Sequence, residues 1–320
     1  MIRFHQGPLA GDTFREEVLA GLARPRKAIP PKFFYDEEGS RLFEAICRLP
    51  EYYPTRTEIG ILAECVAEVR GMVGEGCVLI EPGSGSSLKA RLLIQGLRPR
   101  AYVPMDISQD HLERSARSLA GDFPGLPIHA VAADYTRSLA LPELPQGRRL
   151  VFFPGSTIGN FEPPDARTFL AHMARWCAPD GGILIGVDLK KAPALLHAAY
   201  NDAQGITAAF NLNLLRRINR TLRGDFDVSA FAHYAFYNPP FGRIEMYLVS
   251  LRDQEVHVDG RGFSFERGEG LLTEHSYKYT IRSFQALARE AGLEPLRVWQ
   301  DPEGLFSVHY LRCHQAFHRS

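Results

Sequence analysis

Short apolar segments alternate with helical segments between residues 77 and 188, and this alternation constrains the fold more than any other feature of the sequence. The segments expected to form strands are residues 77–82, 101–106, 127–132, 149–154 and 182–188. The segments expected to form helices between them are residues 89–95, 108–120 and 164–177. Short apolar strands separated by helices are typical of a parallel sheet with helices on both faces. The pattern therefore predicts an α/β protein with a mostly parallel, Rossmann-like sheet.

The segments outside this alternation predict a second domain. A helix is expected over residues 55–73, just before the alternation begins. Residues 190–280 interrupt the alternation, with helix expected over most of 192–222 and antiparallel strands at 243–251, 255–258 and 262–266. The alternation then resumes with a helix at 281–291 and strands at 296–300 and 306–312. We expect an α+β substrate-binding domain from residues 1–56 and 190–278, and a sheet domain from residues 57–189 and 279–320. The ligand cleft is expected between the two domains.

Composition argues against several classes of partner. The 320-residue chain has 37 lysine and arginine residues and 37 aspartate and glutamate residues, so its formal net charge is zero. This balance argues against nucleic acid, which normally binds a basic surface. No apolar run approaches membrane-spanning length and residues 1–10 lack a signal-peptide core, so we expect a cytoplasmic protein that binds no membrane.

The cysteine and histidine residues give no sign of a metal site. The five cysteines are scattered and include no CxxC, and the eleven histidines show no HExxH or paired spacing. We therefore expect no bound metal. Cys65 and Cys77 lie in apolar surroundings, which predicts buried free thiols and suits a reducing compartment.

A glycine-serine loop follows the first predicted strand, in the sequence Leu-Ile-Glu-Pro-Gly-Ser-Gly-Ser-Ser-Leu-Lys at residues 79–89. In an α/β protein this is where a nucleotide-like ligand meets the carboxyl end of a strand. Leu88 stands where a dinucleotide fingerprint has its third glycine, and no Gly-Lys-Ser/Thr follows. The loop therefore favours S-adenosylmethionine over NAD or ATP, although an ordinary tight turn would have the same pattern. Its candidate cofactor contacts are Glu81, Gly83, Ser84 and Gly85.

The next two predicted strands also end in acids. Asp106 lies 23 residues after Gly83, close to the spacing of about 20 expected for an acid that accepts the ribose hydroxyls. The third strand ends in Asp134 and Tyr135, which offer a carboxylate for an exocyclic amine and an aromatic ring beside a base. Alone, either acid could be a helix cap or a turn residue. The three features in this order resemble a class I methyltransferase.

Four further segments carry distinctive signatures. They are Tyr-Asp-x-x-Gly-Ser-x-Leu-Phe from residue 35, Leu-Pro-Glu-Tyr-Tyr-Pro-Thr-Arg-Thr-Glu from 49, Gly-Ser-Thr-Ile-Gly-Asn from 155 and Arg-Ile-Glu-Met from 243. With them, the chain from about Pro30 to Arg312 closely resembles the L-histidine Nα-methyltransferase family of ergothioneine biosynthesis, which makes hercynine. This family has a class I methyltransferase core and a substrate domain, which agrees with the domain boundaries expected above.

The resemblance implies a role for individual residues. S-adenosylmethionine would be held by Gly83, Lys89, Asp106, Asp134 and Tyr135. The carboxylate of the amino acid would be held by Asn160 and Tyr200, and its imidazole by Tyr52, Glu274 and Ser276. The same pocket would be lined by Tyr35, Gly155 and Met246. The two candidates for a catalytic role are Tyr35 and Asn160.

The chemistry of imidazole fits this set of residues. A neutral imidazole has one N–H donor and one acceptor. Glu274 can accept from the donor, while Ser276 or a tyrosine hydroxyl can serve the other nitrogen; tryptophan would satisfy only one of these contacts. We expect a monomeric enzyme that trimethylates the α-amine of L-histidine. The alternatives are an N-methyltransferase for another small amine such as tryptophan, and a non-catalytic protein that binds the cofactor.

Overall fold

The computed structural model describes residues 1–7, 11–85, 88–137 and 139–313, and the chain divides into two compact units. Unit 1 comprises Met1–Leu9, Pro54–Lys190 and Tyr277–Ser320, and unit 2 comprises Ala10–Tyr53 and Lys191–Ser276. We expected the whole of residues 1–56 in the substrate-binding domain. The first residues belong to unit 1 instead, because β1 (Ile2–Gln6) pairs in parallel with β4 (Ile128–Ala132) at one edge of the large sheet.

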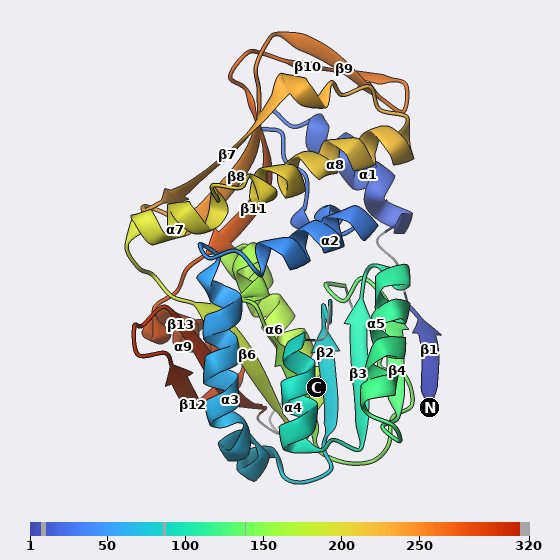
Figure 1. Cartoon of the computed structure of the whole chain (residues 1–320), viewed down its shortest axis with the longest axis vertical. Coiled ribbons are helices and arrows are strands. Elements are labelled where there is room, and N and C mark those ends of the chain that lie inside the picture. Colours follow the sequence, from blue (N-terminus) through green and yellow to red (C-terminus); the bar gives the residue numbers. More distant parts are fainter. Residues whose placement is uncertain (8–10, 86–87, 138, 314–320) are drawn as a thin grey trace. The chain divides into compact units, whose positions relative to one another are not determined.

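Unit 1 is built on an eight-stranded sheet (Figure 1) with the order β1-β4-β3-β2-β5-β6-β13-β12. Its other strands are β2 (Val78–Pro82), β3 (Ala101–Asp106), β5 (Arg149–Phe153), β6 (Gly182–Asp188), β12 (Leu293–Gln300) and β13 (Phe306–Cys313). The pairings from β1 to β6 are parallel, whereas β13 is antiparallel to both β6 and β12. The α/β class with a mostly parallel sheet is therefore confirmed.

Helices cover both faces of this sheet, as the alternation predicted. One face packs against α3 (Tyr53–Val73), α4 (Leu88–Leu97) and α5 (Gln109–Asp122), and the other against α6 (Pro163–Cys177) and α9 (Ile281–Glu290). Neighbouring strand residues point to opposite faces, so Leu79 joins the first core and Ile80 the second. Burial on both faces explains why these strands read as continuous apolar runs.

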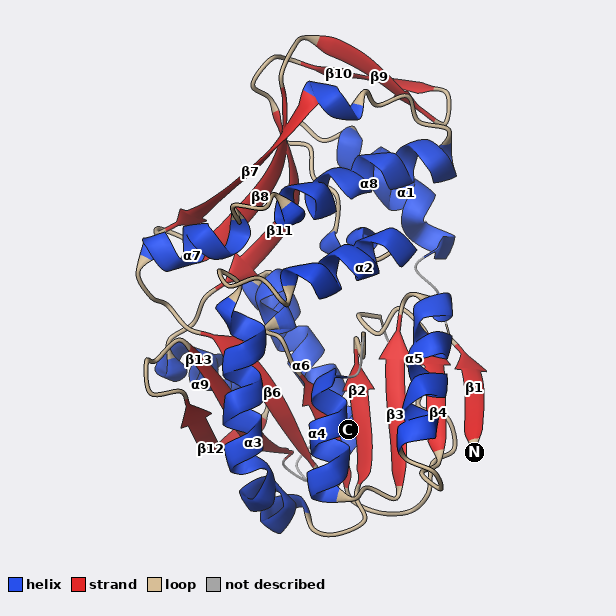
Figure 2. Cartoon of the chain, in the orientation of Figure 1, coloured by secondary structure: helices blue, strands red, loops and turns tan. Residues whose placement is uncertain are grey.

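Unit 2 combines helices with a three-stranded and a two-stranded sheet (Figure 2). The three-stranded sheet has the order β11 (Gly270–Tyr277), β8 (Arg243–Ser250) and β7 (Phe231–Asn238), in which β7 pairs with β8 in antiparallel fashion. In the two-stranded sheet, β9 (Gln254–Val258) pairs with β10 (Arg261–Phe265), also in antiparallel fashion. The α-helices are α1 (Gly11–Leu22), α2 (Glu37–Ile46), α7 (Pro193–Tyr200) and α8 (Ile206–Leu222). Asp36 caps α2 by accepting from the Gly39 N–H at 2.7 Å, and it also accepts from Asn213 of α8 at 2.8 Å. This carboxylate fixes the two helices to each other.

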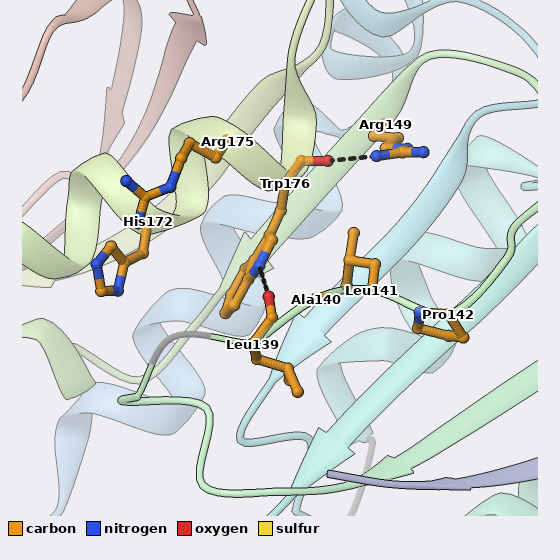
Figure 3. Close-up of a pocket in the computed structure, with 8 residues that line it drawn as sticks. All are labelled: Leu139, Ala140, Leu141, Pro142, Arg149, His172, Arg175 and Trp176. Carbon is orange, nitrogen blue, oxygen red and sulfur yellow. Dashed lines mark hydrogen bonds between the residues drawn. The ribbon is translucent and has the colours of Figure 1, made fainter. Parts of the chain in front are cut away.

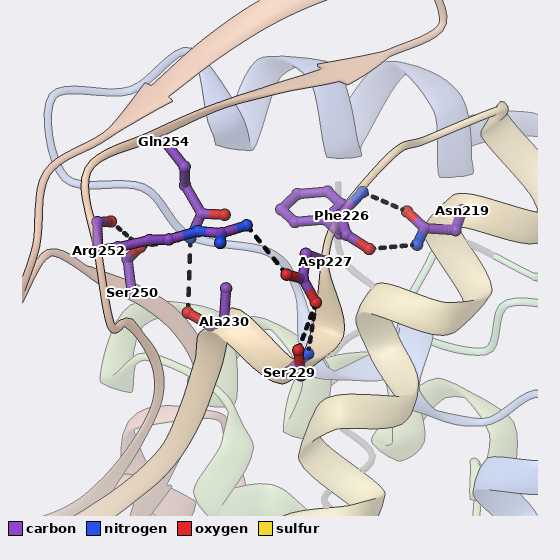
Figure 4. A network of polar contacts seen from close by, with 8 residues as sticks. All are labelled: Asn219, Phe226, Asp227, Ser229, Ala230, Ser250, Arg252 and Gln254. Carbon is purple, nitrogen blue, oxygen red and sulfur yellow. Dashed lines mark hydrogen bonds and ion pairs between the residues drawn. The ribbon is translucent and has the colours of Figure 1, made fainter.

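A network of polar contacts fixes the connection from α8 to β7 (Figure 4). The amide of Asn219 donates to the carbonyl of Phe226 at 2.8 Å and accepts from its N–H at 2.9 Å. Asp227 then caps the short helix Val228–Ala230 through the Ser229 N–H and pairs with Arg252 at 2.9 Å. The turn is therefore closed by side chains at the point where the chain leaves the helix for the sheet.

The cysteines differ in part from the sequence prediction. Cys65 and Cys77 are buried free thiols within the described chain, and burial raises the pKa of Cys65 to about 12 and that of Cys77 to about 11. Cys177 and Cys313, 136 residues apart, form a disulfide between the end of α6 and the end of β13. We did not expect this pair, because adjacency across the fold cannot be deduced from scattered cysteines.

Candidate functional site

The loop after β2 requires glycine in the positions where the sequence has it. Gly83 and Gly85 have φ angles of 71° and 48°, in the left-handed region that favours glycine. The N–H groups of Gly83 and Ser84 donate to the carbonyl of Met105 at 2.8 and 3.0 Å, which fixes the loop to the end of β3. A Cβ on Gly83 would lie 2.8 Å from the hydroxyl oxygen of Tyr135. Two residues predicted from different strand ends are therefore in contact.

Asp106 and Asp134 are buried at the ends of β3 and β4. Asp106 accepts from the Gly85 N–H at 3.1 Å and from the Ser108 N–H at 2.9 Å. Burial raises the pKa of Asp106, and these two N–H groups oppose the rise. A carboxylate has about four acceptor positions, so Asp106 can accept from further hydroxyls. Asp134 accepts from the N–H and the hydroxyl of Thr136, at 3.1 and 2.5 Å.

The loop has features that fit an adenosine-bearing cofactor. Ser84 has a buried hydroxyl oxygen with no hydrogen-bond partner among the described residues, and a buried polar atom of this kind normally has one. A Cβ on Gly85 would meet nothing within 4 Å, so the backbone there borders open space. An unsatisfied hydroxyl, accessible backbone and two strand-end carboxylates together form a cradle that suits S-adenosylmethionine.

Lys89 lies beside this loop with two acids around it. Its ammonium group donates to Glu58 of α3 at 2.5 Å, and it lies 3.7 Å from the position that a Cβ on Gly155 would occupy. The carboxyl group of Glu81 accepts from the hydroxyl of Tyr102. Burial raises the pKa of Glu81 to about 8, against the lowering effects of the Tyr102 hydrogen bond and of Lys89. Glu58 and Tyr102 were not among the predicted site residues.

The segment from Gly155 to Asn160 is fixed at several points within unit 1. Gly155 donates its N–H to Glu58, and the hydroxyl of Ser156 accepts from the Asp188 N–H at 2.9 Å. A Cβ on Gly159 would lie 2.7 Å from the carbonyl oxygen of Tyr277, so the short helix Thr157–Asn160 packs closely against that backbone. Asn160 ends this helix as a half-buried side chain.

The predicted imidazole-binding residues lie together in unit 2. Glu274 and Ser276 are both buried and share one face of β11, because residues two apart in a strand point the same way. Tyr200, at the end of α7, donates its hydroxyl to the Ser276 hydroxyl at 2.8 Å. Met246 of β8 is also buried, and its carbonyl accepts from the Thr273 hydroxyl at 3.1 Å. This pairing connects the two strands that carry predicted residues.

Tyr52 and Tyr35 complete the predicted group. Burial raises the pKa of Tyr52 well above its usual value, and Tyr200, Tyr35 and Glu274 are among the groups that raise it further. The Tyr52 hydroxyl therefore stays protonated at neutral pH and can donate a hydrogen bond. The ring of Tyr35 packs edge-on against Phe43 and Phe210, with centroids 5.6 and 5.8 Å apart.

Two residues that the sequence analysis did not identify support Tyr200. Asn211 donates its amide to Nδ1 of His233 at 2.9 Å, so Nε2 of His233 carries the proton and donates to the Tyr200 carbonyl at 2.9 Å. Burial lowers the pKa of His233, which keeps the ring neutral. Their role depends on the packing of α8 against β7, so the sequence alone did not reveal it.

A cavity of about 390 Å³ lies elsewhere in unit 1 (Figure 3). Arg149, the first residue of β5, contributes to its wall. The cavity therefore lies where the parallel strands begin, at the end of the sheet opposite to Asp106 and Asp134. Its lining contains none of the predicted site residues and consists of Leu139, Ala140, Leu141, Pro142, Arg149, His172, Arg175 and Trp176. The candidate site is therefore defined by the side-chain geometry described above and not by this cavity.

No group of three or more His, Cys, Asp or Glu side chains that could hold a metal ion occurs in the described part of the chain. Among the helices that the structure describes, none is both long and apolar enough to cross a membrane.

The fold and the cofactor cradle define the class of the protein. From β4 to β12 the strand order is β4-β3-β2-β5-β6-β13-β12, with only β13 reversed. The glycine loop stands at the end of β2, and the two acids stand at the ends of β3 and β4. This is a class I methyltransferase, whose cofactor is S-adenosylmethionine. The model of the family described as "Histidine-specific methyltransferase, SAM-dependent" matches residues 14–313, and the chain belongs to this family.

Individual relatives agree with this assignment. The chain is 42% identical over 306 residues to the histidine N-alpha-methyltransferase of Mycolicibacterium smegmatis, covering 93% of this chain and 94% of that protein. It is also 42% identical to the histidine N-alpha-methyltransferase of Mycobacterium tuberculosis, covering 95% and 96% of the two chains. The ergothioneine biosynthesis protein 1 of Neurospora crassa is 32% identical over 88% of this chain, which spans 33% of that longer protein.

Proposed function

We propose that the protein transfers methyl groups from S-adenosylmethionine to the α-amino group of L-histidine, three in succession, and so makes hercynine for ergothioneine biosynthesis. This proposal depends on the pair Glu274 and Ser276, which are buried on one face of β11. The hydroxyl of Tyr200 donates a hydrogen bond to that of Ser276. A buried carboxyl and a buried hydroxyl match the two nitrogens of an imidazole. A side chain that left either group unpaired would be rejected.

The cofactor is assigned to unit 1. When bound, S-adenosylmethionine supplies an electrophilic methyl group on a positively charged sulfonium. Asp106 would accept the ribose hydroxyls, Asp134 the adenine amine, and Tyr135 would lie beside the base. The same cofactor would be contacted by Glu81, Gly83, Ser84, Gly85 and Lys89. The open space at Gly85 and the unpaired hydroxyl of Ser84 support this assignment.

The acceptor amino acid is assigned to the remaining predicted residues. Glu274 would accept from one imidazole nitrogen, while Ser276 and the protonated hydroxyl of Tyr52 would serve the other. Asn160 and Tyr200 would hold the carboxylate. The walls of the same pocket would be Tyr35, Gly155 and Met246. The hydrogen bond from the His233 ring to the Tyr200 carbonyl supports a fixed position for that tyrosine.

The chemical step needs little acid-base machinery. The unprotonated α-amine would attack the methyl group, and the sulfur–carbon bond would break to release S-adenosylhomocysteine. Alignment of the amine with the methyl group would provide most of the acceleration. We assign Tyr35 and Asn160 to this alignment, with a water molecule or a pocket tyrosine relaying the proton. The product is a quaternary ammonium, and the ring of Tyr35, packed against Phe43 and Phe210, offers an aromatic face beside which such a cation is stable.

A panel of acceptors tests the proposed function. Purified protein is incubated with S-adenosylmethionine and, separately, with L-histidine, L-tryptophan and other amino acids, and the S-adenosylhomocysteine formed is measured. We expect turnover with histidine and a rate lower by about 100-fold or more with tryptophan. Comparable rates would contradict the substrate assignment, and no turnover with any acceptor would favour a non-catalytic binding protein.

A monomeric state, a cytoplasmic location and the lack of a nucleic-acid partner stay predictions.

A further inference from the structure

Glu58 is a fully buried carboxylate that none of the proposed contacts uses. It is the last residue of the signature that begins at Leu49, and it lies on α3 with an exposed fraction of 0%. A Cβ on Gly186 would collide with one of its oxygens, so β6 leaves room for the carboxylate by carrying glycine there. A buried charge is costly unless it is paired and hydrogen-bonded.

Two partners from different parts of unit 1 satisfy this carboxylate. Lys89 of α4 donates to Oε2 at 2.5 Å, and the Gly155 N–H lies 2.9 Å from Oε2 and 3.1 Å from Oε1. Lys89, which is assigned to the cofactor, and Gly155 are therefore both hydrogen-bonded to the same carboxylate, that of Glu58. Charge-assisted bonds of this kind are shorter and stronger than neutral ones, so the carboxylate holds both groups firmly.

Lys89 keeps donors for a ligand in this arrangement. An ammonium group has three N–H donors, and Glu58 accepts one of them. The lysine side chain is also 15% exposed, whereas that of Glu58 is not exposed at all. The only anionic group of S-adenosylmethionine is its α-carboxylate, which is therefore the part of the cofactor that an ammonium group would bind.

We propose that Glu58 is a positioning residue. It holds the Lys89 ammonium group beside Gly155, where this ammonium group binds the α-carboxylate of S-adenosylmethionine. The inference rests on the proposed assignment of Lys89 to the cofactor. Glu58 does not touch the cofactor itself and acts through Lys89. Its loss must therefore affect ligands that carry the carboxylate and spare ligands that lack it.

Binding of two cofactor analogues to the Glu58→Gln variant tests the proposal without any histidine present. S-adenosylhomocysteine carries the carboxylate, and 5′-methylthioadenosine carries the adenosine part without it. By calorimetric titration, we expect Glu58→Gln to lower the affinity for S-adenosylhomocysteine by about 10-fold or more and to leave the affinity for methylthioadenosine unchanged. Glu64→Gln, an exposed position on the same helix, is the matched control and should change neither. Equal losses for both analogues, or no loss for either, would overturn the proposal.

A double-mutant cycle with Lys89→Met separates positioning from a general structural role. If Glu58 acts through Lys89, adding Glu58→Gln to Lys89→Met should cost little further affinity for S-adenosylhomocysteine. A full additional 10-fold loss in the double variant would contradict this. If Glu58→Gln does not fold in a thermal melt, Glu58→Asp, which keeps the charge but shortens its reach, should show the same selectivity with a smaller loss. If the unmodified protein bound neither analogue, the proposed function itself would be wrong, and the role of Glu58 with it.

Discussion

Glu274 is a buried carboxyl group at a central position of β11, and several hydroxyl groups of unit 2 belong to the same predicted group of residues. Ser276 lies on the same face of the strand, Tyr200 is bonded to Ser276, and Tyr52 is close enough for the charge of Glu274 to raise the pKa of Tyr52. The predicted group therefore combines one carboxyl group with hydroxyl groups that can both donate and accept. This is the local chemistry on which selectivity for imidazole depends.

Removal of the Glu274 carboxyl group should affect the acceptor and not the cofactor. We expect Glu274→Ala to weaken histidine binding by about 10- to 100-fold, because a hydrogen bond to a charged group contributes roughly 1.5–3 kcal/mol. Separate calorimetric titrations with histidine and S-adenosylhomocysteine check this, with Glu266→Ala at an exposed position of unit 2 as the control. Similar losses for the two ligands would show that Glu274 has no specific role at the acceptor.

Glu81 should make the stability of the protein depend on pH. Its pKa is about 8 in the folded protein and about 4.3 in an unfolded chain, so the folded state binds an extra proton between these values. The contribution to stability is therefore complete below about pH 4.5 and is lost as the pH rises to about 8, with a slope of up to roughly 1.4 kcal/mol per pH unit.

Comparison of the wild type with Glu81→Gln measures this slope. Glutamine keeps an oxygen that can accept from the Tyr102 hydroxyl but cannot titrate. Urea unfolding at several pH values between 5 and 8.5 should show that the free energy of unfolding falls with pH more steeply in the wild type than in the variant. Parallel curves would show that Glu81 is ionised in the folded protein at neutral pH.

At the scale of elements, the helix Thr157–Asn160 depends on close backbone packing. We expect Gly159→Ala to lower the free energy of unfolding by about 1–3 kcal/mol, because the new Cβ would lie 2.7 Å from the Tyr277 carbonyl oxygen. Gly71→Ala on α3 is the matched substitution, since a Cβ there meets nothing within 4 Å. It should stabilise the protein by about 0.5–1 kcal/mol. Urea unfolding of both variants gives the comparison, and equal effects would contradict the packing described for Gly159.

The strands that the sequence predicted best are those that are buried on both faces and therefore form continuous apolar segments. β2, β3, β4, β5 and β6 were predicted to within one residue at each end, because they are apolar on both faces. β1 and β7 were not predicted: β1 is an edge strand with exposed residues on both faces, and β7 is largely half-buried. α1 was not predicted either.

The candidate site was predictable where position in the topology determines it. Asp106 and Asp134 stand at the carboxyl ends of parallel strands, which meet at one edge of a sheet, so their place followed from the order of the strands. Glu58 lies in the first turns of a helix, and its partners are 31 and 97 residues away. His233 and the Cys177–Cys313 pair likewise depend on contacts between distant elements. Such contacts leave no periodicity in a single sequence.

At the scale of the whole molecule, the two units are each assembled from separate stretches of chain. The residues assigned to the cofactor all belong to unit 1, and most of those assigned to the amino acid belong to unit 2. Asn160 and Gly155 are the exceptions, because they lie on the loop after β5 in unit 1. The division agrees with a reaction in which one unit supplies the donor and the other recognises the side chain of the acceptor.

The position of the transferred methyl groups tests the central claim most directly. Purified protein is given L-histidine labelled with nitrogen-15 at the α-amine and S-adenosylmethionine with a deuterated methyl group, and the product is analysed by mass spectrometry and NMR. The account predicts three deuterated methyl groups, all attached to the labelled α-nitrogen. Deuterated methyl groups on an imidazole nitrogen, or histidine recovered without any, would contradict it.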